Sequence, residues 1–403
     1  MRDKFKTINM KKVFLILIIF IALFSCKQSR QEADDYAEHT VDINNPVKIS
    51  IDKFITDFDT IRLEVTNESL MRNASVIHIM DDRFYIKTNR SSGIYVFDLK
   101  GKYLFKINDK GQGPNEYIQI TGFEVDPVNK RIIIADSFSK KILVYNKDGK
   151  LMDVIQLDFP PDIIAFYKNG FVNLYSGFKR FFTNPKMENY NLHFLDSSGK
   201  FVSSAIPKET PNSINITNAN MLDCLENGDI LFQPVLSNIV YKISNDSATP
   251  FYAFNNLSKY KLLTKKDKKT IELIHEPGRT NSFVEKEKEG YLINWGSVID
   301  LTDFICFQFS GWRKTRYLYY SKKTSRTILI EPENVEGEKN LVEILMSQPV
   351  AAKGNTLYIS PSSDLIDIVK GKLKNEKLNT FFNNTGFDSN PVIISFSINF
   401  PEE

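Results

Sequence analysis

The 403-residue chain offers few groups that could carry catalysis or hold a metal, and their spacing argues against both. Its four histidines, His39, His78, His193 and His275, are scattered, and none has the His-x-x-x-His or Glu-paired spacing of a zinc site. No Gly-x-Ser-x-Gly elbow marks a nucleophilic serine. We therefore expect no metal or cofactor and favour a non-catalytic protein, although carboxylates gathered from distant segments would escape this reasoning.

The sequence Gly111-Gln112-Gly113-Pro114-Asn115-Glu116-Tyr117 invites comparison with a nucleotide-binding loop. Glu116 replaces the third glycine, and no Lys-Ser pair completes a phosphate loop. A tight loop between strands explains the segment better. Because loops often carry recognition residues, its side chains are still candidates for binding a partner: Gln112, Asn115, Glu116 and Tyr117.

A second candidate binding region contains both tryptophans of the chain. It runs from Gly278 to Trp295 and continues at Gly311-Trp312-Arg313. Arginine and aromatic side chains stack on sugar rings or peptide side chains and are enriched at binding hot spots. The candidates here are Arg279, Trp295, Trp312 and Arg313. The alternative is that the tryptophans fill the interior of the fold, which we favour for Trp295; for Trp312 the two readings are balanced.

The elements that must position these residues are indicated by a repeated glycine turn. It occurs at Asp98 to Lys102, at Asn146 to Lys150 and at Asp196 to Lys200. Each copy separates two short apolar runs, and the interval of about 50 residues is typical of propeller blades. The aspartates of these turns lack the alternating oxygen ligands of a calcium loop, so we assign them to turn capping.

Further strand pairs extend the repeat to six units. They comprise a fourth unit with turns at 227–229 and 244–247, a fifth around Lys322 to Ser325, and a sixth with strands at Thr356 to Ile359 and Leu365 to Val369. Ser258 to His275 predicts an amphipathic helix between units four and five. The alternating segment Val47 to Leu63 and the final strand Val392 to Asn399 should complete one blade and close the ring. The expected fold is all-β, a six-bladed β-propeller of four-stranded antiparallel blades with a short helical insertion between blades 4 and 5.

The N-terminus reads as a targeting segment. Basic residues precede the apolar run Val13 to Phe24, which is shorter than the ~20 residues that a membrane span needs. The run ends in Leu23-Phe24-Ser25-Cys26, which resembles the lipobox of bacterial lipoproteins and makes Cys26 the expected lipidation site. An ordinary secretory signal is the alternative. The predicted layout is a signal peptide at 1–26, a flexible tether at 27–45 and the propeller at 46–403.

Charge and cysteine content narrow the possible partners. The chain has 52 Lys and Arg against 49 Asp and Glu, and removal of residues 1–26 brings the two nearly level, so nothing favours binding to nucleic acid. After that removal the cysteines are Cys224 and Cys306, both in apolar runs. We expect buried free thiols in preference to a disulfide.

The loop beginning Gly-Gln-Gly-Pro, followed by the strand Ile132 to Asp136, resembles the repeat of NHL-type propellers, with Asn115 where that repeat often has glycine. The whole layout is similar to the six-bladed β-propeller lipoproteins of Bacteroidetes, through the lipobox, Phe58 to Glu64 and Asp388 to Val392. The resemblance implies a lipid-anchored protein of the cell envelope. Lys27 after the cysteine favours the outer membrane, on either its periplasmic or its surface side.

For function, the resemblance and the missing catalytic signatures lead to two hypotheses. The first is a non-catalytic binding or scaffold module for a protein or glycan partner. The second is a propeller-type glycan lyase or hydrolase. The enzyme hypothesis predicts a funnel on the propeller axis that gathers carboxylates, arginines or tyrosines from at least three blades.

Overall fold

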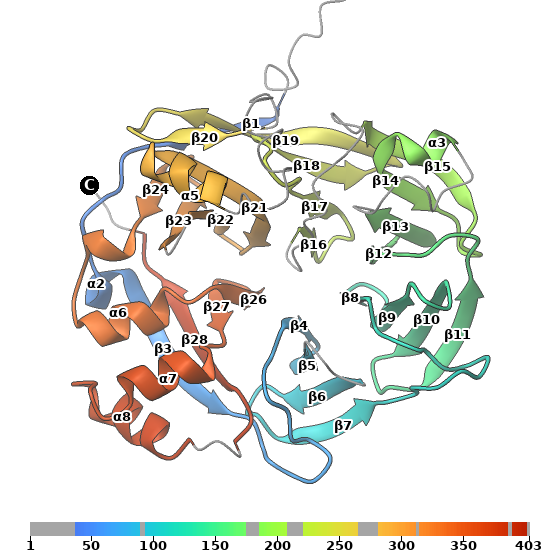
Figure 1. The fold of residues 1–403 in the computed structure, drawn as a ribbon, viewed down its shortest axis with the longest axis horizontal. Helices are drawn as coiled ribbons and strands as arrows, with labels where there is room; N and C mark the ends of the chain where they lie inside the picture. The colour runs from blue at the N-terminus through green and yellow to red at the C-terminus, as the bar shows by residue number, and fades with distance from the viewer. Residues whose placement is uncertain are drawn as a thin grey trace, which may run out of the picture.

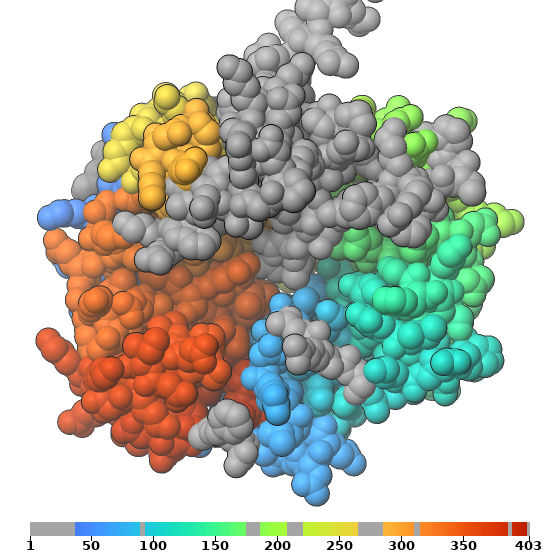
Figure 2. Space-filling model, in the orientation of Figure 1, coloured from blue at the N-terminus to red at the C-terminus, as the bar shows by residue number. Residues whose placement is uncertain are grey.

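The computed structural model describes residues 37–88, 93–174, 185–207, 221–264, 281–311, 314–385 and 389–400. Six sheets stand around one axis like the sectors of a disc (Figure 1), and in the space-filling view the chain colours follow the same circular order (Figure 2). The fold is a six-bladed β-propeller, as the sequence predicts.

Blades 1 to 3 are four-stranded meanders of consecutive antiparallel strands. Blade 1 contains β4 (Val76–Met80), β5 (Arg83–Lys87), β6 (Ile94–Asp98) and β7 (Tyr103–Ile107). Blade 2 contains β8 (Gly122–Asp126), β9 (Arg131–Asp136), β10 (Lys141–Asn146) and β11 (Leu151–Gln156). Blade 3 contains β12 (Ile163–Tyr167), β13 (Gly170–Leu174), β14 (Tyr190–Leu195) and β15 (Phe201–Pro207).

Blades 4 and 5 each carry a fifth strand that pairs in parallel with the meander. Blade 4 contains β16 (Leu222–Cys224), β17 (Ile230–Phe232), β18 (Ile239–Ser244) and β19 (Ser247–Asn256), with β1 (His39–Ile43) added beside β19. Blade 5 contains β21 (Tyr291–Asp300), β22 (Phe304–Gly311), β23 (Lys314–Ser321) and β24 (Thr327–Ile330), with β20 (Lys261–Leu263) added beside β21.

Blade 6 joins the two ends of the chain. It contains β26 (Pro349–Lys353), β27 (Thr356–Ile359) and β28 (Val392–Ile398), and its outer strand is β3 (Ile55–Arg62) from the N-terminal side. The antiparallel pairing of β3 with β28 confirms that terminal strands complete one blade. The ring is thereby closed, and a closed ring leaves only short, protected sheet edges.

The ordered structure reaches further toward the N-terminus than the predicted tether allows. Strand β1 lies inside the range 27–45, yet it pairs with β19 along its whole length. After β1 the chain forms β2 (Ile49–Ser50), which pairs with β25 (Val335–Glu336), and the short helix α2 (Ile51–Phe54). The chain therefore contacts blades 4 and 5 before it enters blade 6.

The strands of blades 1 to 3 read as continuous apolar runs because both faces of a blade pack against neighbouring blades. In β9, the side chains of Ile132, Ile133 and Ile134 are all fully buried. Ile133 packs in the cluster shared with blade 3, whereas Ile132 and Ile134 pack in the cluster shared with blade 1. Alternate residues thus face opposite neighbours, as the two-residue period of a strand requires.

The three repeated glycine turns join the third and fourth strands of blades 1, 2 and 3. In the first turn, Asp98 Oδ1 accepts the N–H groups of Lys100 and Lys102, both at 2.9 Å, and Gly101 has φ +86°. A Cβ on Gly101 would lie 2.1 Å from the carbonyl oxygen of Arg62. The assignment to turn capping is confirmed for Asp98 and Asp196, whose carboxylates accept N–H groups of their own turns. It is wrong for Asp148: in the second turn Asn146 is the capping residue, and Asp148 pairs with Arg83.

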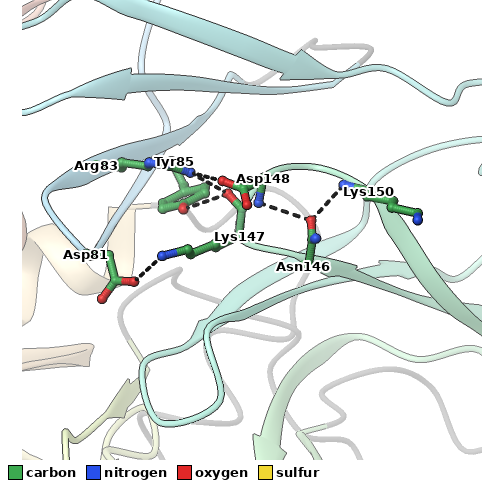
Figure 3. Close-up of polar contacts among 7 residues, drawn as sticks. All are labelled: Asp81, Arg83, Tyr85, Asn146, Lys147, Asp148 and Lys150. Atoms are coloured by element: carbon green, nitrogen blue, oxygen red, sulfur yellow. Dashed lines mark hydrogen bonds and ion pairs between the residues drawn. The ribbon is translucent and has the colours of Figure 1, made fainter.

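The turn of blade 2 also attaches that blade to blade 1 (Figure 3). Arg83 Nη1 donates to Lys147 O at 2.9 Å and to Asp148 Oδ1 at 2.7 Å, and Tyr85 Oη donates to Lys147 O at 3.0 Å. Lys147 Nζ forms an ion pair with Asp81 Oδ2 of blade 1 at 3.2 Å. Burial raises the pKa of Tyr85 to about 12, so its hydroxyl keeps the proton that it donates.

The sixth unit differs from the prediction. Leu365 to Val369 is not a strand but part of helix α7 (Ser363–Val369). Ser362 caps this helix by accepting the N–H of Leu365, and the buried Ile366 and Val369 lie three residues apart, on one helical face. Two further helices, α6 (Lys339–Leu345) and α8 (Glu376–Asn383), flank α7 on the outside of blade 6 (Figure 1).

A short helical insertion between blades 4 and 5 is present, at a different position from the predicted one. Helix α5 (Asn281–Lys288) precedes β21, whereas residues 261–263 of the predicted helix form β20. Residues 265–275 of that prediction lie outside the described residues. The remaining helical turns are α3 (Pro185–Glu188) and the 3₁₀ turn η3 (Pro332–Asn334).

The structure also shows the state of the two cysteines and the lengths of the helices. Cys224 and Cys306 are both free thiols, as predicted; Cys306 is buried and Cys224 is half-buried. None of the helices in the described ranges combines the length and the apolar composition that a membrane crossing requires.

Candidate functional site

The axis of the propeller holds a cavity of about 850 Å³. Its walls come from the first strands of five blades, β4, β8, β16, β21 and β26, and from the turns that follow them. Within the described residues, β12 of blade 3 contributes nothing to the walls and packs instead against β8 and β9. The cavity therefore lies in the half of the axis where the first strands end.

The lining includes a histidine and three carboxyl side chains that lie on the first strands of four different blades. They are His78 on β4, Glu124 on β8, Asp223 on β16 and Asp300 on β21. Three of them are carboxylates from three blades, which is the arrangement that the enzyme hypothesis predicts. Aliphatic residues alternate with these groups along the strands, and the accessible lining is mixed, with more polar than apolar surface.

His78 and Glu124 share one proton. His78 Nε2 lies 3.2 Å from the carbonyl oxygen of Phe123, which can only accept, so Nε2 carries a hydrogen. His78 Nδ1 lies 3.1 Å from Glu124 Oε1, and this contact requires a proton between the two atoms. Burial lowers the pKa of His78 to about 4 and raises the pKa of Glu124 well above its usual range. The proton therefore resides on Glu124, and the pair is neutral.

The second oxygen of Glu124 is left for a ligand. Oε1 accepts the N–H of Val125 at 2.9 Å in addition to its contact with His78, whereas Oε2 has no partner among the described residues. The side chain is 5% exposed. This oxygen is not among the buried atoms without a partner, so it is accessible from the cavity and can accept a hydrogen bond from water or a ligand.

Asp223 and Asp300 form the second polar group of the cavity. Asp223 Oδ2 accepts the N–H of Asp300 at 2.6 Å, and the carboxylate of Asp300 pairs with Lys322 Nζ at 2.8 Å. Burial raises the pKa of Asp223 to about 7, and the negative charge of Asp300 acts in the same direction. Asp223 thus exchanges a proton near neutral pH, whereas Lys322 counters the effect of burial on the pKa of Asp300.

The acidic residues at the turn end of the cavity are compensated by lysines. Asp81 pairs with Lys130 at 2.8 Å and with Lys147 at 3.2 Å, and these lysines lower its pKa. Asp82 pairs with Lys353 from blade 6. These pairs link neighbouring blades around the opening, whereas Glu124 and Asp223 in the interior have no lysine or arginine partner among the described residues. Within the described ranges, no three His, Cys, Asp or Glu side chains converge to hold a metal ion.

Comparison with known proteins places the chain in a family. A family model described as a domain of unknown function, DUF4934, matches residues 37–397. The chain belongs to this family. Among proteins with curated descriptions, none matches the chain significantly.

Two solved structures from Bacteroides share the fold of this DUF4934 member. One, from Bacteroides fragilis, is described as an exported protein; it is 15% identical, covers 90% of this chain and 100% of its own, and has a TM-score of 0.73. The other is a member of the DUF4221 family from Bacteroides vulgatus, 11% identical, covering 89% of this chain and 99% of its own, with a TM-score of 0.55. At these identities the likeness concerns the fold alone.

The predicted binding loop lies away from the cavity. Gln112 and Asn115 are exposed, Glu116 Oε2 accepts the N–H of Gly113 at 2.7 Å, and Tyr117 is fully buried in the core between blades 1 and 2. The loop precedes the start of β8, whereas the cavity lies toward its end. The two candidate surfaces are therefore separate.

The other predicted residues are placed in part. Trp295, on β21, packs partly buried against the apolar cluster shared by blades 3, 4 and 5, and it is not among the residues that line the cavity. Arg279, Trp312, Arg313 and Cys26 lie outside the described residues.

Sequence reasoning missed the axial residues although a local signal exists. His78 stands between two isoleucines, Glu124 between Phe123 and Val125, and Asp223 between Leu222 and Cys224. A charged residue in the middle of a buried apolar strand needs a reason, because desolvating it costs free energy. The spacing along the chain gave no indication that these positions converge.

Proposed function

We propose that this protein is a lipid-anchored component of the cell envelope that binds a polar ligand, a glycan or peptide segment, in its axial cavity. The observation that carries the proposal is the cavity itself, about 850 Å³ with a mixed polar and apolar lining that includes Glu124 and Asp223, neither of which pairs with a described lysine or arginine. Ligand sites commonly measure ~300–1,000 Å³ and combine apolar walls with a few polar groups. A structurally similar Bacteroides fragilis protein is described as exported, which supports the envelope assignment.

Narrowing the cavity at its opening tests this function. Thr302 is exposed and lines the cavity, so Thr302→Trp narrows the opening without entering the core. Thr324→Trp places the same bulk on an exposed turn of blade 5 that does not line the cavity. We expect ligands from a panel of glycan and peptide fragments to bind the wild type and Thr324→Trp, and to bind Thr302→Trp at least tenfold more weakly. Equal binding to both variants, or no binding to any protein, would overturn the proposal.

A second candidate function is hydrolysis or elimination on a glycan. Glu124 holds a proton and Asp223 has a pKa of about 7, so one cavity contains a potential general acid and a potential general base. Incubation with polysaccharide pools should then yield new reducing ends or unsaturated products, and Glu124→Gln should abolish them. If no product forms with the wild type while ligands bind, the non-catalytic function holds.

The lipid anchor is tested separately. Cys26→Ala should release the protein from membranes and abolish acyl labelling, and separation of inner from outer membranes should place the wild type in the outer membrane. Protease treatment of intact cells then distinguishes the surface from the periplasmic side. Unchanged membrane association of Cys26→Ala would refute the lipobox.

A further inference from the structure

The interior of the axial cavity presents hydrogen-bond acceptors that no described donor satisfies. Glu124 and Asp223 line the cavity on first strands, and neither forms an ion pair with a described lysine or arginine. Glu124 keeps Oε2 without a partner on a side chain that is 5% exposed, and Asp223 uses Oδ2 for the N–H of Asp300. A ligand for this interior must bring donors.

An ammonium group matches these acceptors. It carries three N–H donors on one positive centre, which can meet carboxyl oxygens arriving from different blades. The partly exposed aliphatic residues of the lining, Ile79, Leu225 and Val350, provide a surface for the carbon atoms that bear the amine. A metal ion matches less well, since no described group of three or more ligating side chains converges.

We propose that the axial cavity binds a protonated primary amine, and that the entry of this amine drives protons from Asp223 and Glu124 into solvent. The inference rests on the proposed function in that the cavity must be a ligand site, and it names the chemical class of the ligand. No covalent bond changes: each carboxyl loses its proton to the buffer and becomes the carboxylate partner of the ammonium.

The charged groups around the two carboxyls determine the pH dependence. Asp223 faces the negative charge of Asp300 and, further away, Lys322, while Glu124 faces His78, Asp223 and the Cys224 thiol. With a pKa of about 7, Asp223 is about one-tenth ionised at pH 6 and about nine-tenths ionised at pH 8. Amine affinity should therefore rise about tenfold between these pH values.

Isothermal titration calorimetry of the purified mature protein with small probe molecules tests the inference. The probes are pentylammonium against 1-pentanol, and glucosamine against glucose. We expect the amines to bind and their neutral counterparts to bind at least tenfold more weakly. Titrations in phosphate and in MOPS, which differ in ionisation enthalpy and contain no primary amine, should show proton release that is greater at pH 6 than at pH 8.

Two variants and one control assign the effect. Asp223→Asn should lower amine affinity about tenfold at pH 8 and flatten its pH dependence, and Glu124→Gln should lower the number of protons released. Asp148→Asn removes a carboxylate from an exposed turn and should change neither quantity.

The outcomes separate this inference from the proposed function. If glucose or pentanol binds as well as its amine, or if Ca²⁺ alone competes for the same site, the amine inference is wrong while the cavity remains a ligand site. If no probe and no ligand of the fragment panel binds, both proposals fail. Amine binding that Thr302→Trp leaves intact would place the amine outside the cavity and would also overturn the inference.

Discussion

The raised pKa of Asp223 has a direct consequence for stability that does not depend on any ligand. The folded state holds a proton on Asp223 up to a pH of about 7, whereas an unfolded aspartate loses it near 3.8. Stability from this group is therefore fully present below 3.8 and is lost as the pH rises toward 7. Replacing Asp223 by asparagine, which is uncharged at every pH, removes this loss while keeping an oxygen that can accept the N–H of Asp300.

The magnitude follows from the size of the shift. About three pKa units correspond to about 4 kcal/mol in full, at 1.36 kcal/mol per unit. Asp223 is half-buried and borders the cavity, so solvent screens part of this and about half remains. Roughly 1–2 kcal/mol of this loss of stability occurs between pH 5 and pH 8. The remainder occurs below pH 5, where the unfolded aspartate becomes largely ionised.

Thermal unfolding at the two pH values measures the effect. We expect the Tm of Asp223→Asn, relative to wild type, to be about 2 °C higher at pH 8 than at pH 5, since a domain of this length changes its Tm by little more than 1 °C per kcal/mol. Asp148→Asn, which removes an exposed carboxylate paired with Arg83, should show the same Tm difference at both pH values. A pH-independent difference for Asp223→Asn would refute the raised pKa and with it the proton coupling of the cavity.

Three further predictions concern the scaffold. Gly149→Ala should destabilise the protein by about 2 kcal/mol or more in urea denaturation, because φ is +81° and the new Cβ would lie 2.5 Å from Phe105; Gly371→Ala, with φ +73° and open space, should cost about 1 kcal/mol. Arg316→Leu should lower the free energy of unfolding by about 3–5 kcal/mol, because the buried Glu331 carboxylate loses its 2.5 Å ion-pair partner. The double variant Arg316→Leu/Glu331→Leu should recover most of this loss. Truncation through β3 should expose the edge of β28 and yield aggregates on size exclusion, whereas truncation through β1 should leave a monomeric disc of lower Tm.

The architecture could be predicted because it is encoded locally and repeatedly. Each copy of the glycine turn contains its own capping side chain, as Asp98, Asn146 and Asp196 all accept the N–H groups two and four residues ahead. Such turns need no distant contact to form, so their period reports the blade period directly. In blade 4 the equivalent turn has Asn245 and Asp246 at positive φ in place of glycine, which is why this copy is harder to recognise.

The sequence did not distinguish helix from strand in blade 6. A five-residue, apolar-rich segment such as Leu365 to Val369 suits a strand and a buried helical turn equally well. The deciding signal is one hydrogen bond, from the N–H of Leu365 to the side chain of Ser362. Serine is equally common in turns between strands, so the sequence alone does not distinguish the two outcomes.

The axial site escaped prediction for a different reason, and that reason supports its functional assignment. The middle strands of a blade face neighbouring blades on both sides, and polar residues there are used for local structure. Asn173 on β13 accepts the N–H of Asp162, and His193 on β14 contacts the carbonyl oxygen of Met187, both within blade 3. The first strand differs, because its inner edge faces the axis. Glu124 and Asp223, on first strands, keep oxygens directed at a space that no described donor fills. Asn173 Nδ2 is itself buried without a partner, so unsatisfied polar atoms are not confined to the first strands. What distinguishes Glu124 and Asp223 is that they line the axial cavity, where a ligand could reach them.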